Sequence, residues 1–221
     1  GRLVRENGHT SNPGRLVKML AENVVARGGR LLQERVIGFD TNDLGVTAVR
    51  TDRGTHAAKA VVIATGAWSK PLAKMLGDDL PLDTERGYHI VVRDAESGPR
   101  IPTMWVEGKI IATAMEGVVL TMLEPILPPN WARADVQLSL GRKMYPALPA
   151  SHPEERISRW LGFRPSMPDS LPVIGPTSRY ANAFLAFGHG HVGMAAGSTT
   201  GRVVAEIVSG RAPSIPLAPF S

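Results

Sequence analysis

Apolar residues near the start of the chain follow the spacing of a helix. Between Asn12-Pro13 and Gly28-Gly29 they recur every three or four positions, as on one helix face. These positions are Leu16, Val17, Leu20 and Val24. Asparagine is a favoured N-cap, proline suits the first helical position, and glycine commonly ends a helix. The pattern therefore predicts a helix from Pro13 to the glycine pair.

The residues that follow change to the spacing of strands. Residues 30–37 and 46–51 read as strands, and Asp52-Arg53-Gly54-Thr55 has the composition of a hairpin turn. Residues 59–64 form a continuous apolar run of the kind that is buried on both faces of a sheet, and Thr65-Gly66-Ala67-Trp68-Ser69 leads from it into another helix. This order predicts an α/β arrangement with an inserted β-meander.

From about Pro81 to Leu123 the chain consists of short β-like runs that glycine and proline separate. The runs cover residues 88–92, 103–106, 110–114 and 118–123. They predict an antiparallel sheet that forms a second layer or domain. A loop at 125–129 and a helix at 132–145 follow, and residues 157–164 lead back towards the first domain.

Near the C-terminus a short apolar strand at 184–187 enters a glycine-rich turn, and a helix of small residues follows at 195–208. Such a junction exposes backbone N–H groups beside the positive end of a helix dipole. Gly188, Gly190 and Gly193 let an electron-rich or anionic group approach the main chain. The turn therefore predicts a place for part of a cofactor, although the same glycines also suit a tight turn that packs a helix on a strand.

Composition excludes several classes of function. The 221 residues contain no cysteine, which excludes disulfides, thiolate metal sites and cysteine nucleophiles. The net charge is +5, but the 25 Lys and Arg residues are scattered and few aromatic residues could stack bases, so we expect no nucleic-acid partner. No apolar run approaches the ~20 residues that span a bilayer. We also find no leader with a basic start and an apolar middle, and we expect a cytoplasmic protein.

Four segments, spread over nearly the whole chain, carry a family resemblance. They are Gly8-His9-Thr10-Ser11-Asn12-Pro13; Val61-Val62-Ile63-Ala64-Thr65-Gly66-Ala67-Trp68-Ser69; Gly162-Phe163-Arg164-Pro165 with Pro168-Asp169-Ser170-Leu171-Pro172-Val173-Ile174-Gly175; and Gly188-His189-Gly190-His191-Val192-Gly193-Met194. In this order they resemble the C-terminal part of the FAD-dependent D-amino-acid oxidase and dehydrogenase superfamily. The chain looks most similar to the small subunit of bacterial D-amino-acid dehydrogenase, and glycine and sarcosine oxidases are more distant.

The resemblance implies an incomplete FAD-binding domain of Rossmann type, interleaved with an antiparallel-sheet substrate domain. Residues 1–80 and 161–221 would belong to the FAD-binding domain, and residues 81–160 to the substrate domain. The family normally begins with a strand and a Gly-x-Gly-x-x-Gly turn that holds the FAD pyrophosphate, and no such turn occurs near Gly1. We therefore interpret the chain as a fragment or short form without this N-terminal half, and we expect it to self-associate or to need the missing half.

The resemblance also implies which side chains bind the substrate. Arg164 corresponds to the arginine that holds the substrate carboxylate over the flavin, and a guanidinium fork binds a planar carboxylate in bidentate fashion. Tyr88 and His89 stand where relatives place substrate-pocket residues. The alternatives are a structural salt bridge for Arg164 and packing on the sheet for the other two.

Cofactor contacts are implied at two turns and one strand. The glycine-rich turn would lie against the flavin, and the turn after residues 59–64 would lie near the adenosine-diphosphate half of FAD, unless it is an ordinary strand-to-helix turn. The residues concerned are Gly188, His189, Gly190, Val192, Gly193 and Met194; Thr65, Gly66 and Ala67; and Val36, which matches a residue that contacts adenine. His189 and His191 flank a glycine without an accompanying carboxylate cluster, so we predict no metal site.

The implied reaction is FAD-dependent oxidative deamination of a small amino acid or amine. A hydride leaves the substrate Cα for the flavin ring, and the resulting imine hydrolyses to a keto acid and ammonia. This reaction needs no protein nucleophile, so the protein contributes positioning and electrostatics. Two alternatives remain open: oxidation of glycine or sarcosine by the same kind of site, and a non-catalytic role as a flavoprotein-like scaffold subunit.

Overall fold

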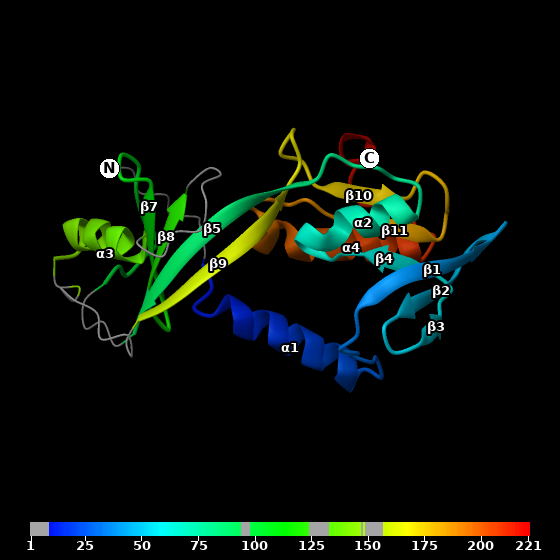
Figure 1. Cartoon of the computed structure of the whole chain (residues 1–221), viewed down its shortest axis with the longest axis horizontal. Coiled ribbons are helices and arrows are strands. Elements are labelled where there is room, and N and C mark those ends of the chain that lie inside the picture. Colours follow the sequence, from blue (N-terminus) through cyan, green and yellow to red (C-terminus); the bar gives the residue numbers. More distant parts are fainter. Residues whose placement is uncertain (1–8, 94–97, 124–132, 147, 149–156) are drawn as a thin grey trace. The chain divides into compact units, whose positions relative to one another are not determined.

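The computed structural model describes residues 9–93, 98–123, 133–146, 148 and 157–221 (Figure 1). The chain divides into two compact units, each made of two separate stretches of sequence. Unit 1 comprises Gly1–Leu31 and Arg86–Gly162, and unit 2 comprises Leu32–Glu85 and Phe163–Ser221. Strands β5 (Asp83–Val92) and β9 (Ile157–Ser166) each carry the chain from one unit into the other. Which unit serves the cofactor and which the substrate stays a prediction.

Unit 1 is built on a five-stranded sheet with the strand order β6-β7-β8-β5-β9. Besides β5 and β9, its strands are β6 (Thr103–Trp105), β7 (Ile110–Met115) and β8 (Gly117–Leu123). The pairs β6–β7, β7–β8 and β8–β5 are antiparallel, which confirms the sheet predicted from the short β-like runs. Helix α3 (Arg133–Met144) packs on β7 and β8. The loop expected at 125–129 lies outside the described residues.

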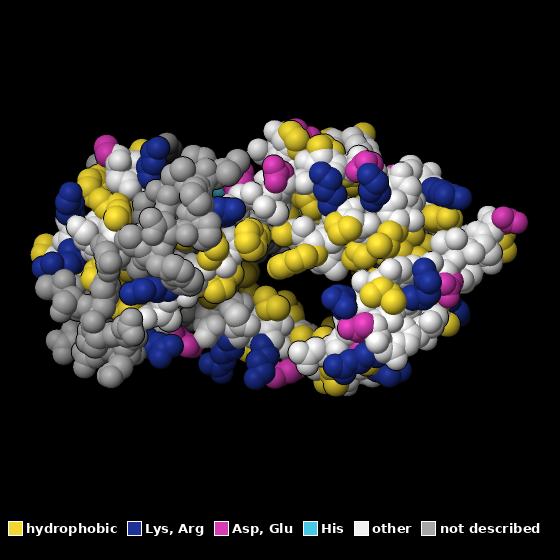
Figure 2. Space-filling model, in the orientation of Figure 1, with side chains coloured by type: hydrophobic (Ala, Val, Ile, Leu, Met, Phe, Trp, Pro, Cys, Tyr) yellow, Lys and Arg dark blue, Asp and Glu magenta, His cyan; other side chains and the backbone are white. Residues whose placement is uncertain are grey.

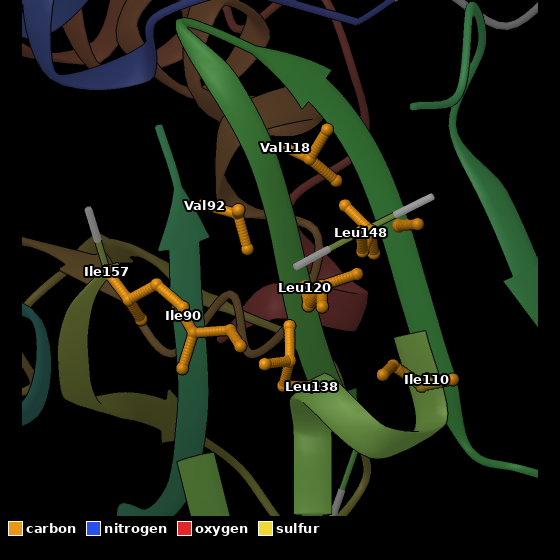
Figure 3. Packing of buried hydrophobic residues seen from close by; sticks show 9 residues of the cluster. Ile90, Val92, Ile110, Val118, Leu120, Leu138, Leu148 and Ile157 are labelled. Carbon is orange, nitrogen blue, oxygen red and sulfur yellow. The ribbon is translucent and has the colours of Figure 1, made fainter. Parts of the chain in front are cut away.

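An aliphatic core joins this sheet to α3 (Figure 3). Its buried members are Ile90, Val92, Ile110, Ala112, Val118, Leu120, Leu138, Leu148 and Ile157. Within β5, β7 and β8 these residues are two positions apart, so each strand turns one face to the core. Each fully buried Leu, Ile or Val side chain contributes about 1.5–3 kcal/mol, so this core holds the strands in register.

Helix α1 (Pro13–Ala26) forms where its cap and spacing predict it. The side chain of Asn12 accepts the backbone N–H of Arg15 at 2.8 Å, and Pro13 occupies the first helical position. None of the helix residues is buried, and its large apolar residues from Leu16 to Val25 are between 41% and 60% exposed. Figure 2 shows hydrophobic side chains among Lys and Arg on this part of the surface. The described residues therefore leave the apolar face of α1 uncovered.

Unit 2 contains two three-stranded sheets within the described residues. The first is an antiparallel meander of β1 (Val36–Asn42), β2 (Gly45–Thr51) and β3 (Thr55–Ala57), with the predicted turn between β2 and β3. The second has the order β10-β11-β4 and consists of β4 (Val61–Ile63), β10 (Val173–Pro176) and β11 (Ala183–Phe187). Strand β11 pairs antiparallel with β10 and parallel with β4. The α/β arrangement with an inserted meander is confirmed.

Helices cover part of the second sheet. They are η1 (Gly66–Trp68), α2 (Ser69–Met75), α4 (Gly193–Val208) and η3 (Ala218–Phe220). Helix α2 packs on β4, and α4 packs on β10 and β11. The buried core of this unit consists of Val46, Val61, Ile63, Ala73, Leu76, Leu82, Ala183, Leu185 and Phe187. It anchors both ends of β4 and β11, from which two of the predicted cofactor turns emerge.

Two local strand predictions are wrong. The strand expected from residue 30 begins only at Val36, because the backbone N–H of Arg35 donates to the carboxylate of Asp52 at 3.0 Å and not to a neighbouring strand. The run at 59–64 forms a strand only at Val61–Ile63, and Val62 is 39% exposed. One face of β4 is thus not covered by the described residues, contrary to the expected burial on both faces.

Candidate functional site

Two of the predicted cofactor turns lie at one edge of the same sheet. Strands β4 and β11 are parallel, so their carboxyl ends point the same way. Thr65, Gly66 and Ala67 follow β4, and Gly188 follows β11. Thr65 Oγ1 lies 3.0 Å from Ser69 Oγ, and Ser69 is fully buried, which fixes the first turn. Ligands of open α/β sheets bind at such carboxyl ends, so the geometry suits a cofactor here.

The turn between β11 and α4 needs glycine and leaves the helix start uncapped. Gly188 and Gly190 have φ angles of 88° and 51°, in the left-handed region that other residues rarely adopt. A Cβ on Gly188 would lie 2.9 Å from Met167 Cγ. Val192 occupies the N-cap without a side-chain cap, and no acidic residue stands in the first turn of α4. These first N–H groups suit an electron-rich oxygen, such as those on the pyrimidine edge of a flavin.

The same turn is bonded to the end of β9, directly after Arg164. Gly190 N–H donates to the carbonyl oxygen of Pro165 at 2.7 Å, and His189 forms an antiparallel bridge with Ser166. The structure therefore brings the glycine-rich turn and the Gly-Phe-Arg-Pro segment together. Separately, His189 Nε2 lies 2.8 Å from Thr200 Oγ1 of α4, and burial lowers the pKa of the imidazole, which favours its neutral form.

Arg164 lies half-buried in this cluster beside an acidic residue that sequence reasoning missed. Burial lowers the pKa of the guanidinium, and the negative charge of Glu85 opposes this effect. Glu85 Oε2 also lies 2.8 Å from His191 Nε2. The sequence offered one signal for Glu85, its place directly before Arg86-Gly87-Tyr88-His89. The cluster can bind a carboxylate through Arg164, with Glu85 and His191 setting the charge around it.

Tyr88 and His89 belong to unit 1, where the His89 ring stacks on another ring and the Tyr88 backbone accepts a hydrogen bond. The His89 ring stacks on the Trp160 ring with centroids 4.8 Å apart and planes inclined by 22°. The backbone oxygen of Tyr88 accepts a hydrogen bond of 3.1 Å from Gln137 Nε2. Trp160 also covers Gly162, where a Cβ would lie 1.7 Å from the indole ring. Sequence reasoning missed Trp160, which explains why the segment begins with glycine.

Three predicted cofactor contacts remain, at Val36, Val192 and Met194. Val36 begins β1, so it belongs to the meander and not to the sheet that carries the two turns. Val192 and Met194, in the turn and at the start of α4, are more than half exposed. Among the described residues no group of three or more His, Asp or Glu is arranged to hold a metal ion. Likewise, none of the described helices has the length and apolar character to cross a membrane.

The chain is similar to several known proteins. The family described as DAO, FAD dependent oxidoreductase, matches residues 1–207. The chain is 41% identical to a D-amino-acid oxidase of Bradyrhizobium diazoefficiens, over 100% of the chain and 54% of the relative. It is 34% identical to D-amino acid dehydrogenase 2 of Mesorhizobium japonicum, over 81% of the chain and 44% of the relative. The structure is similar to that of glycine oxidase from Geobacillus kaustophilus, with a TM-score of 0.82, 26% identity, and coverage of 93% of this chain and 56% of that one.

The chain spans about half the length of the curated relatives that it matches. The solved structure likewise extends well beyond the part that this chain covers. The residues described above therefore represent one part of the family's fold.

Proposed function

Because the chain belongs to the DAO family of FAD-dependent oxidoreductases, we propose that it supplies the substrate-binding side of an enzyme that oxidises a small amino acid. One observation supports this most strongly. The hydrogen bond from Gly190 to Pro165 joins the uncapped start of α4 to the segment of Arg164. A group that accepts hydrogen bonds from the turn would therefore lie next to a carboxylate held by the guanidinium.

In this proposal each part of the site has a distinct role. Arg164 binds the substrate carboxylate through its planar fork and so orients the Cα–H bond. The N–H groups of Gly193 and Met194 at the start of α4 face the flavin, and Thr65 to Ala67 lie near the adenosine-diphosphate half. FAD, when bound, supplies a two-electron acceptor for the hydride from Cα. Tyr88 and His89 contribute a wall of the substrate pocket, and Val36 contacts the adenine.

The preferred substrate is a small D-amino acid, and the similarity of the chain to a D-amino-acid oxidase supports this choice. A second candidate is glycine or sarcosine, because the similar solved structure is a glycine oxidase. The non-catalytic scaffold role is the third. From the sequence alone we expect a cytoplasmic location.

A chimera tests the proposed function. The N-terminal portion of the Bradyrhizobium oxidase that this chain does not cover is fused ahead of Gly1, and the flavin absorbance is followed after anaerobic addition of D-alanine, glycine or sarcosine. We expect D-alanine to bleach the flavin most rapidly. Bleaching by glycine or sarcosine alone would favour the second candidate. A chimera that binds FAD and is bleached by none of them would favour the scaffold role.

Arg164→Lys in the chimera tests the central residue. Lysine keeps the charge but loses the fork, and a hydrogen bond to a charged group contributes about 1.5–3 kcal/mol. We expect kcat/KM for D-alanine to fall about 10- to 100-fold. Arg211→Lys is the matched control, because Arg211 is an exposed arginine beyond the end of α4. Equal kinetics of the two variants would contradict the role of Arg164.

A further inference from the structure

We propose that Glu85 sets the substrate class of this site: it occupies His191, the second side chain beside Arg164 that could bind a carboxylate, so the site accepts amino acids with one carboxylate and rejects acidic ones. The inference rests on the proposed function, in which Arg164 binds the substrate carboxylate. It adds a selectivity rule that follows from the arrangement of charges at the end of β9.

The geometry places three ionisable side chains in one cluster of unit 2. Glu85 Oε2 lies 2.8 Å from His191 Nε2. His191 follows Gly190, whose N–H is bonded to Pro165, the neighbour of Arg164. Electrostatic interaction between Glu85 and the Arg164 guanidinium is consistent with this proximity. The carboxylate of Glu85 thus interacts with both the His191 imidazole and the Arg164 guanidinium.

The charges of this cluster decide what a ligand meets. Arg164 is always a cation, and the Nε2 atom of His191 is a second group that a carboxylate could contact. Without Glu85, the guanidinium and the imidazole would both be open to a ligand, and a dicarboxylate could bind both. When Glu85 is present, its carboxylate contacts His191, and its negative charge repels a second carboxylate of the ligand. A ligand with a single carboxylate needs only Arg164 and avoids this repulsion.

The alternative is that Glu85 and His191 form an ordinary surface ion pair. Their side chains are 43% and 52% exposed, and exposed pairs generally contribute little to stability. Stability therefore cannot distinguish the two explanations. Ligand selectivity can, because a surface pair without a role in the site would leave the relative affinity for one and two carboxylates unchanged.

The experiment measures carboxylate binding to the chain itself, without flavin or turnover. Propionate and succinate are titrated into the wild-type chain, Glu85→Gln and Asp83→Asn in the same buffer. NMR signals of the Arg164 side chain report the dissociation constants. Asp83 is the matched control, because it loses the same charge two positions away in the same strand.

We expect the wild-type chain to bind propionate at least as tightly as succinate. In Glu85→Gln the affinity for succinate relative to propionate should rise about tenfold, and in Asp83→Asn it should change less than twofold. Adding His191→Asn to Glu85→Gln should remove the gain, since the imidazole that the second carboxylate would contact is then absent. A ratio in Glu85→Gln equal to that in Asp83→Asn overturns the proposal.

Further outcomes separate this inference from the proposed function. Propionate binding that is weakened in Arg164→Lys, with an unchanged succinate ratio in Glu85→Gln, overturns the role of Glu85 alone. Absence of propionate binding at Arg164 overturns both. If circular dichroism shows that Glu85→Gln does not fold, the wild-type chain decides: tighter binding of succinate than of propionate overturns the proposal, and the reverse order supports it.

Discussion

Replacing Gly162 by alanine would perturb the packing directly before Arg164. A Cβ at this position would lie 1.7 Å from the nearest carbon of the Trp160 ring and 2.2 Å from the next. Non-bonded carbon atoms require about 3.5–4.0 Å. The indole must therefore move by roughly 2 Å, or strand β9 must shift by a similar amount.

The expected decrease in the free energy of unfolding has two contributions. Overpacking of a core costs about 1–3 kcal/mol, and because Trp160 is 55% exposed we take the lower end of this range. Displacement of the indole also weakens its stack on His89, and an aromatic pair contributes about 0.5–1.5 kcal/mol. We expect Gly162→Ala to destabilise unit 1 by about 2 kcal/mol, which lowers the midpoint of thermal unfolding by roughly 4–8 °C for a chain of this size.

The assay is thermal unfolding followed by circular dichroism, with Gly201→Ala as the matched control. Nothing lies within 4 Å of a Cβ on Gly201, which stands inside helix α4, so this variant should gain up to about 1 kcal/mol. Gly162→Ala is also measured in a chain that carries Trp160→Ala, because this chain lacks the ring that the new Cβ would contact. If Gly162→Ala costs as much with Trp160→Ala as without it, the reasoning is refuted.

Three further predictions concern the rest of the chain. Hydrogen bonds from Thr51 and His56 lower the pKa of Glu34. This carboxylate therefore stabilises the fold above its ordinary pKa of 4.5, and the stabilisation is lost as the pH falls. In Glu34→Gln the midpoint of thermal unfolding should depend less on pH in the acid range. The chain alone should bind FAD weakly and turn over little substrate, because it has no Gly-x-Gly-x-x-Gly turn near Gly1; a purified chain that retains FAD through ultrafiltration and reduces dye with D-alanine would contradict this. The exposed apolar face of α1 (Figure 2) should make the chain self-associate, and Leu20→Lys should reverse this; light scattering that shows only monomers at all concentrations would count against it.

Local sequence rules predicted the elements that local interactions determine. The Asn12 cap, the turn between β2 and β3, and the glycine-rich turn before α4 all formed where their residue types indicated. These features depend on hydrogen bonds and dihedral angles within a few residues. The approach of the Arg164 segment to this turn was expected only through the family resemblance. In the structure the Gly190 N–H donates to the carbonyl oxygen of Pro165, and a shared site for Arg164 and the turn stays a prediction.

Features that depend on distant residues were not predictable in the same way. The pairing of Glu85 with His191 joins the start of β5 to the turn before α4, and no local pattern links them. The contact of Trp160 with Gly162 depends on a ring orientation that spacing does not reveal. Apolar periodicity located the apolar face of α1 but could not show that the described residues leave it exposed, and the exposure of Val62 was missed for the same reason.

The most direct test of the central claim is an NMR titration of the isotope-labelled chain with FAD and with propionate. If the glycine-rich turn and Arg164 form one site, FAD will shift the backbone amide signals of Gly190, Gly193 and Met194, propionate will shift the Arg164 side-chain signal, and each ligand will alter the affinity for the other. The account is contradicted if FAD and propionate shift signals elsewhere, or if they bind these two segments with no effect on each other.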